Sequence, residues 1–141
     1  MLIFLDFDGV LRRKTSPLYR LEAPLVACFE EALRAIPGAE VVISSSWRDA
    51  FSLAEMRRLF SPDVAERIAG VTPVSQDRDG FYRHREVLAY LKRNGHAGHR
   101  WIAIDDDPEH YPANSPVLLV DPARGFDADA RARLLDTARQ L

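Results

Sequence analysis

The sequence predicts an α/β protein in which a parallel sheet of about five strands is flanked by helices. Short apolar runs alternate along the chain with segments of helical periodicity, which is the order expected of βαβ units. The apolar runs are rich in β-branched residues and lack strict alternation of apolar and polar positions. This composition is typical of strands that are buried on both faces of a parallel sheet.

Five segments have the character of buried strands, and the three strongest run directly into a cluster of polar residues. The strong strands are Leu2–Leu5, Val41–Ile43 and Trp101–Ile104, and the weaker ones are Gly70–Val74 and Val117–Val120. In open α/β sheets, ligands bind at the carboxyl ends of the strands. If the three strong strands are neighbours, their polar clusters converge on one small volume.

The helices are predicted from apolar spacing and from capping signals. Apolar residues repeat at helical spacing from Leu25 to Ile36, where Pro37 and Gly38 end the segment. Ser52–Glu55 has the pattern of a capping box. Three further helices are expected, one with Pro62 in its first turn, one over 83–94 that closes at Gly95, and a last one capped by Asp127.

Length and composition fit a single domain that spans residues 1–141. The formal net charge of −2 gives no overall electrostatic reason to bind nucleic acid or a membrane, so a polyanionic substrate would need a local basic patch. Cys28 is the only cysteine, which excludes an intramolecular disulfide. No apolar stretch is long enough to span a bilayer, and a cytoplasmic location is the default expectation.

The acidic residues that follow two of the strong strands predict a magnesium site. Asp6 and Asp8 follow the first strand, Gly9 permits a sharp turn there, and three more aspartates occupy 105–107. Clustered carboxylates raise one another's pKa unless a cation is present. Oxygen ligands with incomplete protein coordination suit Mg²⁺, because phosphate and water complete its shell.

The same residues suit phosphoryl transfer, which depends on positioning and charge neutralisation. Asp6 is a candidate nucleophile that would form an aspartyl-phosphate, and Asp8 is a candidate acid and base for the leaving oxygen and the water. Ser44, the first polar residue after its strand, could donate a hydrogen bond to a phosphoryl oxygen. Arg83 and Arg85 are the candidates for the cation that balances the remaining phosphoryl charge.

Each motif taken alone also has a plainer interpretation. An Asp-x-Asp pair is common in turns, serines 44–46 could only begin a helix, and the acids before Pro108 could only cap one. Arg83 alone is most simply a solvated surface residue. The functional interpretation is favoured because three separate strand ends carry complementary parts of one site.

Three segments resemble motifs of the haloacid dehalogenase (HAD) superfamily. Phe4–Leu11 resembles the first motif, hhhDxDGxhh, Val41–Ser44 the second, and Ile104–Asp107 the acidic-pair form of the fourth. The resemblance implies a Rossmann-like, HAD-type fold in which the first aspartate is the nucleophile and the second the acid/base. It also implies that Mg²⁺ is held by Asp6, by the backbone carbonyl of Asp8, and by the fourth-motif residues Asp105 and Asp106.

The third motif departs from the superfamily, which supplies a lysine where this chain offers arginine. The segments Ser44–Arg48, Gly70–Pro73 and Arg83–Val87 are similar to a small HAD subgroup associated with RNA-repair proteins. In that subgroup an arginine three positions before a glutamate stands in for the lysine, which favours Arg83 over Arg85. Gly9, Ser45, Arg48 and Arg85 are further candidates for contacts with the substrate.

The intervals between motifs predict a minimal cap or none, because the first helix takes up most of the chain between the first two motifs. An open site favours large substrates such as RNA or DNA ends or phosphoproteins, unless another subunit supplies a cap. The basic residues of Arg12–Lys14, with Arg20, could meet a polyanionic backbone, and Tyr19 and Phe81 could stack a base. A solvated loop explains the basic residues equally well, and isolated aromatic residues are more often packing residues.

Several functions therefore stay open. The favoured one is hydrolysis of a phosphomonoester, with a nucleic-acid terminal phosphate as the substrate that the resemblance implies. A phosphatase of small metabolites or phosphoproteins would use the same chemistry. A non-catalytic module that binds phosphate or metal would not need Asp8 as an acid/base. A receiver-type signalling domain is disfavoured by Gly9 and by the cluster at 46–48.

Overall fold

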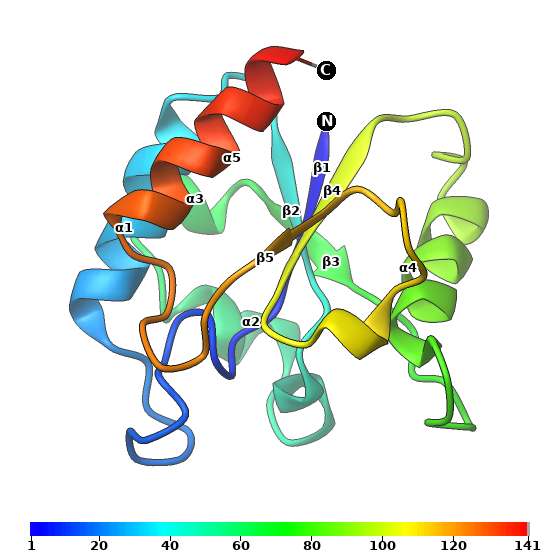
Figure 1. Cartoon of the computed structure of the whole chain (residues 1–141), viewed down its shortest axis with the longest axis horizontal. Coiled ribbons are helices and arrows are strands. Elements are labelled where there is room, and N and C mark those ends of the chain that lie inside the picture. The colour runs from blue at the N-terminus through cyan, green and yellow to red at the C-terminus, as the bar shows by residue number, and fades with distance from the viewer. Residues whose placement is uncertain (141) are drawn as a thin grey trace.

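The computed structural model describes residues 1–140, and its five strands form one parallel sheet (Figure 1). The strands lie in the order β3-β2-β1-β4-β5, and all their pairings are parallel. Their bounds are β1 Leu2–Leu5, β2 Glu40–Ile43, β3 Ile68–Val71, β4 Trp101–Asp105 and β5 Val117–Leu119. The predicted α/β fold with a five-stranded, Rossmann-like sheet is confirmed.

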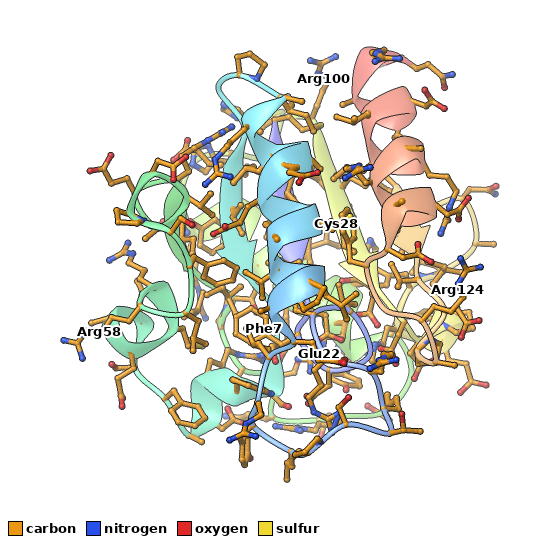
Figure 2. The ribbon with its side chains drawn as sticks, turned by 90° about the vertical axis from the view of Figure 1, so that its left-hand side faces the viewer. Phe7, Glu22, Cys28, Arg58, Arg100 and Arg124 are labelled. Atoms are coloured by element: carbon orange, nitrogen blue, oxygen red, sulfur yellow. The ribbon has the colours of Figure 1, made fainter. Side chains whose placement is uncertain are left out.

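Helices cover both faces of the sheet. α1 and α5 lie side by side on one face, and α4 covers the other (Figures 1 and 2). The α-helices are α1 Ala23–Arg34, α2 Leu53–Arg57, α3 Pro62–Ala65, α4 Tyr82–Arg93 and α5 Ala128–Gln140. Two 3₁₀ turns, η1 over Ser46–Asp49 and η2 over Pro108–His110, follow β2 and β4 at the carboxyl edge of the sheet.

Side chains of β1 alternate between two separate apolar cores, because successive residues of a strand point to opposite faces. Ile3 and Leu5 belong to the larger core beneath α1 and α5, together with Phe29. Phe4 belongs to the smaller core beneath α4, where its ring meets Tyr90 edge-on at 5.8 Å between centroids. Since the strands are buried on both faces, their sequences show no alternation of apolar and polar residues.

The predicted capping signals are present. Ser52 and Glu55 form a reciprocal capping box at the start of α2, and Pro62 occupies the first turn of α3. The side chain of Asp127 accepts a hydrogen bond of 3.0 Å from the backbone nitrogen of Ala130 at the start of α5. The local signals thus placed these helix starts to within a residue or two.

One strand differs from its prediction, because β3 covers Ile68–Val71 and ends before Pro73. Proline has no N–H to donate to a neighbouring strand, so regular pairing stops there. The last contact with β2 is the hydrogen bond of 3.0 Å from the nitrogen of Thr72 to the carbonyl of Ile43. Ile68 joins the strand because its side chain is buried in the larger core.

The strand order creates a switch point between β1 and β4, since the chain builds outward from β1 on one side and from β4 on the other. Leu5 is paired with Ile43 on β2 and with Ile104 on β4. The residues that follow these three positions are therefore at one level of the carboxyl edge. They are Asp6, Ser44 and Asp105.

The intervals between the motifs hold no separate cap domain within residues 1–140. A loop leads from β1 to α1, and between β2 and β3 the chain forms only η1, α2 and α3. The carboxyl edge thus carries loops and short helices (Figure 1). None of the helices in the described part of the chain has the length and apolar character that a membrane crossing requires.

Candidate active site

Three carboxylates meet at the switch point of the sheet. One oxygen from each of Asp6, Asp105 and Asp106 lies within 4.8 Å of the others. Asp6 and Asp105 are buried, at 4% and 0% exposure. Burial, followed by the negative charges of Asp105 and Asp106, raises the pKa of Asp6 well above its usual value, although Arg83 and the backbone nitrogen of Phe7 oppose this. The cluster therefore favours a cation that would offset its charge.

The donor set of this cluster fits Mg²⁺. All three side chains offer hard oxygen ligands, and three protein ligands leave coordination positions for water and phosphate. Gly9 is what lets Asp106 approach, because a Cβ at position 9 would overlap the Asp106 carboxylate. Gly9 also has a φ of +78°, which L-residues with side chains rarely adopt. Position 9 therefore requires glycine for two reasons, its positive φ and the close approach of the Asp106 carboxylate.

Asp8 lies outside the acidic cluster and has its own partners. Its Oδ1 accepts a hydrogen bond of 3.0 Å from the indole Nε1 of Trp47 and lies 3.3 Å from Nε of Arg12. β1 ends at Leu5, so strand alternation, which would put Asp6 and Asp8 on one side of a continuing strand, does not apply to these two residues. The predicted role of the Asp8 backbone carbonyl as a magnesium ligand stays a prediction.

Ser44 presents a buried hydroxyl that has no hydrogen-bond partner within residues 1–140. Its backbone nitrogen donates to the carbonyl of Leu5 over 2.9 Å, which fixes the residue beside the end of β1. Its exposure is 1%. Leaving a buried hydroxyl without a partner lowers the stability of a protein by about 1–3 kcal/mol. Such groups in folded proteins are therefore commonly paired with a ligand or a water. A phosphoryl oxygen would supply the missing acceptor.

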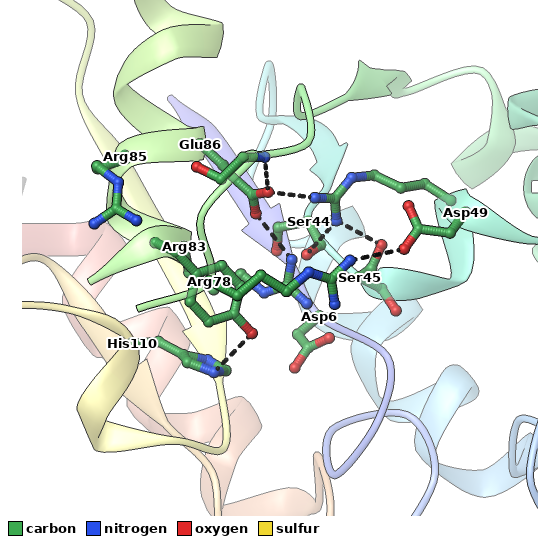
Figure 3. A network of polar contacts seen from close by, with 12 residues as sticks. Asp6, Ser44, Ser45, Asp49, Arg78, Arg83, Arg85, Glu86 and His110 are labelled. Atoms are coloured by element: carbon green, nitrogen blue, oxygen red, sulfur yellow. Dashed lines mark hydrogen bonds and ion pairs between the residues drawn. The ribbon is translucent and has the colours of Figure 1, made fainter. Parts of the chain in front are cut away.

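Glu86 joins two arginines with buried side chains, Arg48 and Arg83, into one network (Figure 3). Its Oε1 accepts from Nη1 of Arg83 at 2.9 Å, and its Oε2 accepts from Nη2 of Arg48 at 2.6 Å. The backbone nitrogen of Ser75 also donates to Oε2, at 2.7 Å. Two positive groups share one carboxylate here, so the network holds more positive than negative charge beside the acidic cluster.

Arg83 and Arg85, the two candidates for the third-motif cation, have different surroundings. Burial alone would lower the pKa of the Arg83 guanidinium, but the charge of Asp6 and the contacts with Glu86 raise it overall. The Nε of Arg83 is buried without a partner among the described residues. Arg85 instead donates to the carbonyls of Asp77 and Asp79, each at 3.0 Å, and its side chain is 46% exposed.

A family model described as the HAD domain in Swiss Army Knife RNA repair proteins matches residues 2–130. The chain belongs to this family. Searches of the curated proteins and of the solved structures each find no match. The suspected resemblance to the HAD superfamily, and to its RNA-repair branch, is therefore confirmed.

Ser45 and Arg48, two of the residues predicted to bind substrate, make hydrogen bonds within the HAD domain. Arg48 donates through Nη1 to the carbonyls of Ser44 and Ser45, at 3.1 and 2.8 Å. The hydroxyl of Ser45 accepts from the nitrogen of Trp47 at 3.2 Å and so caps η1. These contacts fix the turn that carries Ser44. A direct contact of Ser45 or Arg48 with substrate stays a prediction.

Two side chains that the motifs did not identify, His110 and Lys14, reach the acidic residues of the HAD site. His110 lies with Nδ1 3.1 Å from both oxygens of Asp105, and Tyr82 contacts its Nε2 at 3.3 Å. Burial opposes protonation of His110, but the hydrogen bond and charge of Asp105 raise its pKa. Lys14 places Nζ 3.3 Å from Oδ2 of Asp106. In the sequence, Lys14 is distinguished only as part of a basic run, and no motif indicates His110.

Proposed function

We propose that this HAD domain is a Mg²⁺-dependent phosphomonoester hydrolase that forms an aspartyl-phosphate on Asp6, with a nucleic-acid terminal phosphate as its favoured substrate. One observation carries the proposal. At the switch point, the carboxylates of Asp6, Asp105 and Asp106 meet, and the neighbouring strand end carries Ser44, whose buried hydroxyl has no partner among the described residues. These are the groups that in-line transfer of a phosphoryl group requires: a nucleophile, ligands for a cation, and a donor for a phosphoryl oxygen.

In the first step, a carboxylate oxygen of Asp6 attacks phosphorus and the bond from phosphorus to the ester oxygen breaks. Asp8 gives its proton to that leaving oxygen. In the second step, Asp8 takes a proton from water, whose oxygen attacks phosphorus, releases inorganic phosphate and restores the Asp6 carboxylate. Ser44 and Arg83 donate to the phosphoryl oxygens in both steps. Magnesium, held by Asp6, Asp105 and Asp106, would neutralise charge on the phosphoryl group.

The surroundings of Asp8 support its role as the acid and base. The side chain of Asp8 is 26% exposed, whereas Asp6 is almost fully buried, so Asp8 can meet both a leaving group and water. The indole of Trp47 and the guanidinium of Arg12 hold its carboxylate in one orientation. A module that only bound phosphate or metal would gain little from a carboxylate placed apart from the acidic cluster.

The preference for nucleic-acid ends rests on the open edge and on the family. The described residues form no separate cap domain between the motifs, which favours access of a large substrate to the carboxyl edge. Lys14, whose side chain is 57% exposed, extends beside Asp106 and supplies positive charge at the entrance. The matching family is named for RNA-repair proteins, which act on nucleic acid.

A phosphate-release screen tests this function directly. The substrates are 3′- and 5′-phosphorylated oligonucleotides, nucleotides, sugar phosphates and phosphopeptides, each with Mg²⁺ and with EDTA. We expect release that depends on Mg²⁺, that is restored when Mg²⁺ is added back after EDTA, and that is fastest with a phosphorylated oligonucleotide. Release from none of these substrates would refute the hydrolase, and fastest release from sugar phosphates or phosphopeptides would refute the favoured substrate.

Replacing Asp8 with asparagine should slow turnover by about 10²- to 10⁴-fold, the usual contribution of a general acid and base. Asparagine can still accept the hydrogen bond from Trp47, so the local structure should persist. The loss should be larger for an alkyl phosphate than for p-nitrophenyl phosphate in single-turnover phosphorylation of the enzyme, because nitrophenolate leaves without a proton. Asp49→Asn, an exposed aspartate of η1, is the matched control. Equal losses with both leaving groups would remove the acid role.

A further inference from the structure

An apolar hollow is connected to Asp8 through Trp47, and the proposed function does not yet use it. Its volume is about 270 Å³. This is slightly below the ~300–1,000 Å³ of typical small-molecule sites, so it suits one flat ring system rather than a large ligand. Its lining is mainly apolar and aromatic, and comprises Tyr19, Trp47, Phe51, Glu55, Met56, Arg58 and Leu59.

Trp47 connects this hollow to the candidate active site. Its ring lines the hollow, while its indole Nε1 donates to Oδ1 of Asp8 over 3.0 Å. In the proposed reaction, Asp8 gives its proton to the leaving oxygen of the ester. The group attached to that oxygen must therefore begin at Asp8, next to the tryptophan that forms part of the hollow.

Tyr19 forms an exposed wall of the hollow. Its exposure is 51%, and its ring meets Trp47 and Phe51 edge-on, at 5.3 and 5.4 Å between centroids. Its backbone has a φ of +58°, in the left-handed region that non-glycine residues seldom occupy. The contacts with the two other rings hold the residue in this conformation and keep a large aromatic surface accessible.

The charges around the hollow favour an anionic partner. Arg58 lines it, and Arg20 lines a second hollow that shares Tyr19 and Leu59 with the first. The acidic residue of the lining, Glu55, is already engaged by the backbone nitrogen of Ser52 in the capping box. An aromatic ring attached to a phosphate backbone matches both the apolar lining and this positive rim.

We propose that this hollow binds the nucleobase of the nucleotide whose ester bond is cleaved, on the leaving-group side of the site. The proposal rests on the proposed function, because the position of the leaving group follows from Asp8 acting as the acid. It assigns to Tyr19 the role of selecting base-bearing substrates over esters that lack a base. Neighbouring nucleotides would then pass Arg20 and Arg58.

The test measures kcat/KM for a nucleoside monophosphate and for ribose phosphate with the phosphate on the same oxygen. Stacking on one aromatic side chain contributes about 1–3 kcal/mol, so Tyr19→Ala should reduce the preference for the nucleotide by about 5- to 150-fold. Tyr19→Phe, which keeps the ring, should retain the preference. Leu18→Ala is the matched control, because Leu18 is the preceding residue, is 63% exposed and lines neither hollow.

A preference that Tyr19→Ala leaves unchanged would overturn the proposal, as would an equal fall in Leu18→Ala. A loss in Tyr19→Ala that is larger for a phosphotyrosine peptide than for the nucleotide would assign the hollow to a protein substrate instead.

If no phosphate ester is hydrolysed, the proposed function fails by itself. The hollow is then judged by calorimetric titration of the protein with a nucleoside monophosphate and with ribose phosphate. Tighter binding of the nucleotide that Tyr19→Ala abolishes supports the base site, and equal affinities overturn it.

Discussion

Replacing Asp6 with asparagine is expected to reduce phosphate release by about 10⁴-fold or more, as losses of essential nucleophiles do. The amide of asparagine does not attack phosphorus, and the substitution also removes one carboxylate from the acidic cluster. The fold should tolerate the change, since asparagine has nearly the same shape. The measurement is single-turnover phosphate release with Mg²⁺, and Asp136→Asn on the exposed side of α5 is the matched control.

Asp6→Asn should also change the stability of the protein, independently of its effect on turnover. Because burial and the neighbouring acids raise the pKa of Asp6, the native state binds protons more tightly than the unfolded chain does. The contribution of Asp6 to stability is therefore fully present below the pKa that it has in the unfolded chain. It is lost as pH rises from that value through the raised pKa of the native state. In EDTA near neutral pH, Asp6→Asn should be at least as stable as the unmodified chain, and Mg²⁺ should raise its Tm less. Normal hydrolysis of p-nitrophenyl phosphate by this variant would show that Asp6 is not the nucleophile.

The sheet was predictable because most of its strands are clear apolar runs in the sequence. Leu2–Leu5 and Val41–Ile43 are uninterrupted apolar runs, and burial on both faces of a parallel sheet explains such runs directly. The error at β3 arose where that logic is weakest. After the buried Ile68, its positions are exposed or half-buried, and Val74, which the apolar run included in the predicted strand, is 51% exposed beyond Pro73. Pairing rather than hydrophobicity sets the end of that strand.

The acidic cluster was predictable for a related reason. Asp6 and Asp105 each occupy the end of a central strand, and the register between β1 and β4 brings such positions together without any further adjustment. Contacts made by long side chains were not predictable in this way. Lys14 reaches Asp106 from a loop, and His110 reaches Asp105 from a 3₁₀ turn. Whether these side chains meet the acids depends on loop conformations that no periodicity in the sequence specifies.

The choice between Arg83 and Arg85 as the third-motif cation depends on both the family resemblance and the structure. The sequence left Arg83 and Arg85 as alternatives, and only the family resemblance favoured the first. The two residues are two positions apart on α4, which turns them about 200° from each other around the helix axis. One of them can therefore face the sheet edge while the other faces solvent. The buried network of Arg83 with Glu86 identifies the inward-facing one.

Arg83→Ala should reduce kcat/KM by about 10³- to 10⁵-fold, the range seen when an arginine that neutralises a transferring phosphoryl group is lost. Arg85→Ala should change it much less, because Arg85 contacts the carbonyls of Asp77 and Asp79 at the protein surface. Arg83→Lys should recover only part of the activity, since an ammonium group cannot reproduce the two-pronged contact of a guanidinium with phosphate. A larger loss in Arg85→Ala than in Arg83→Ala would reverse the assignment.

A fall in activity on removing Arg83 must be separated from a loss of folding, because Glu86 would lose one of its partners inside the protein. Removing one member of a buried ion pair destabilises proteins by about 3–5 kcal/mol, but Arg48 and the nitrogen of Ser75 still hold this carboxylate. Thermal unfolding of the variant measures that cost directly. Addition of guanidinium ion at millimolar concentration separates the two effects: it should partly restore turnover to folded Arg83→Ala, and it should not restore turnover to Asp6→Asn. Restoration in neither variant, with Arg83→Ala folded, would mean that the guanidinium acts on the structure of the site rather than on the phosphoryl group.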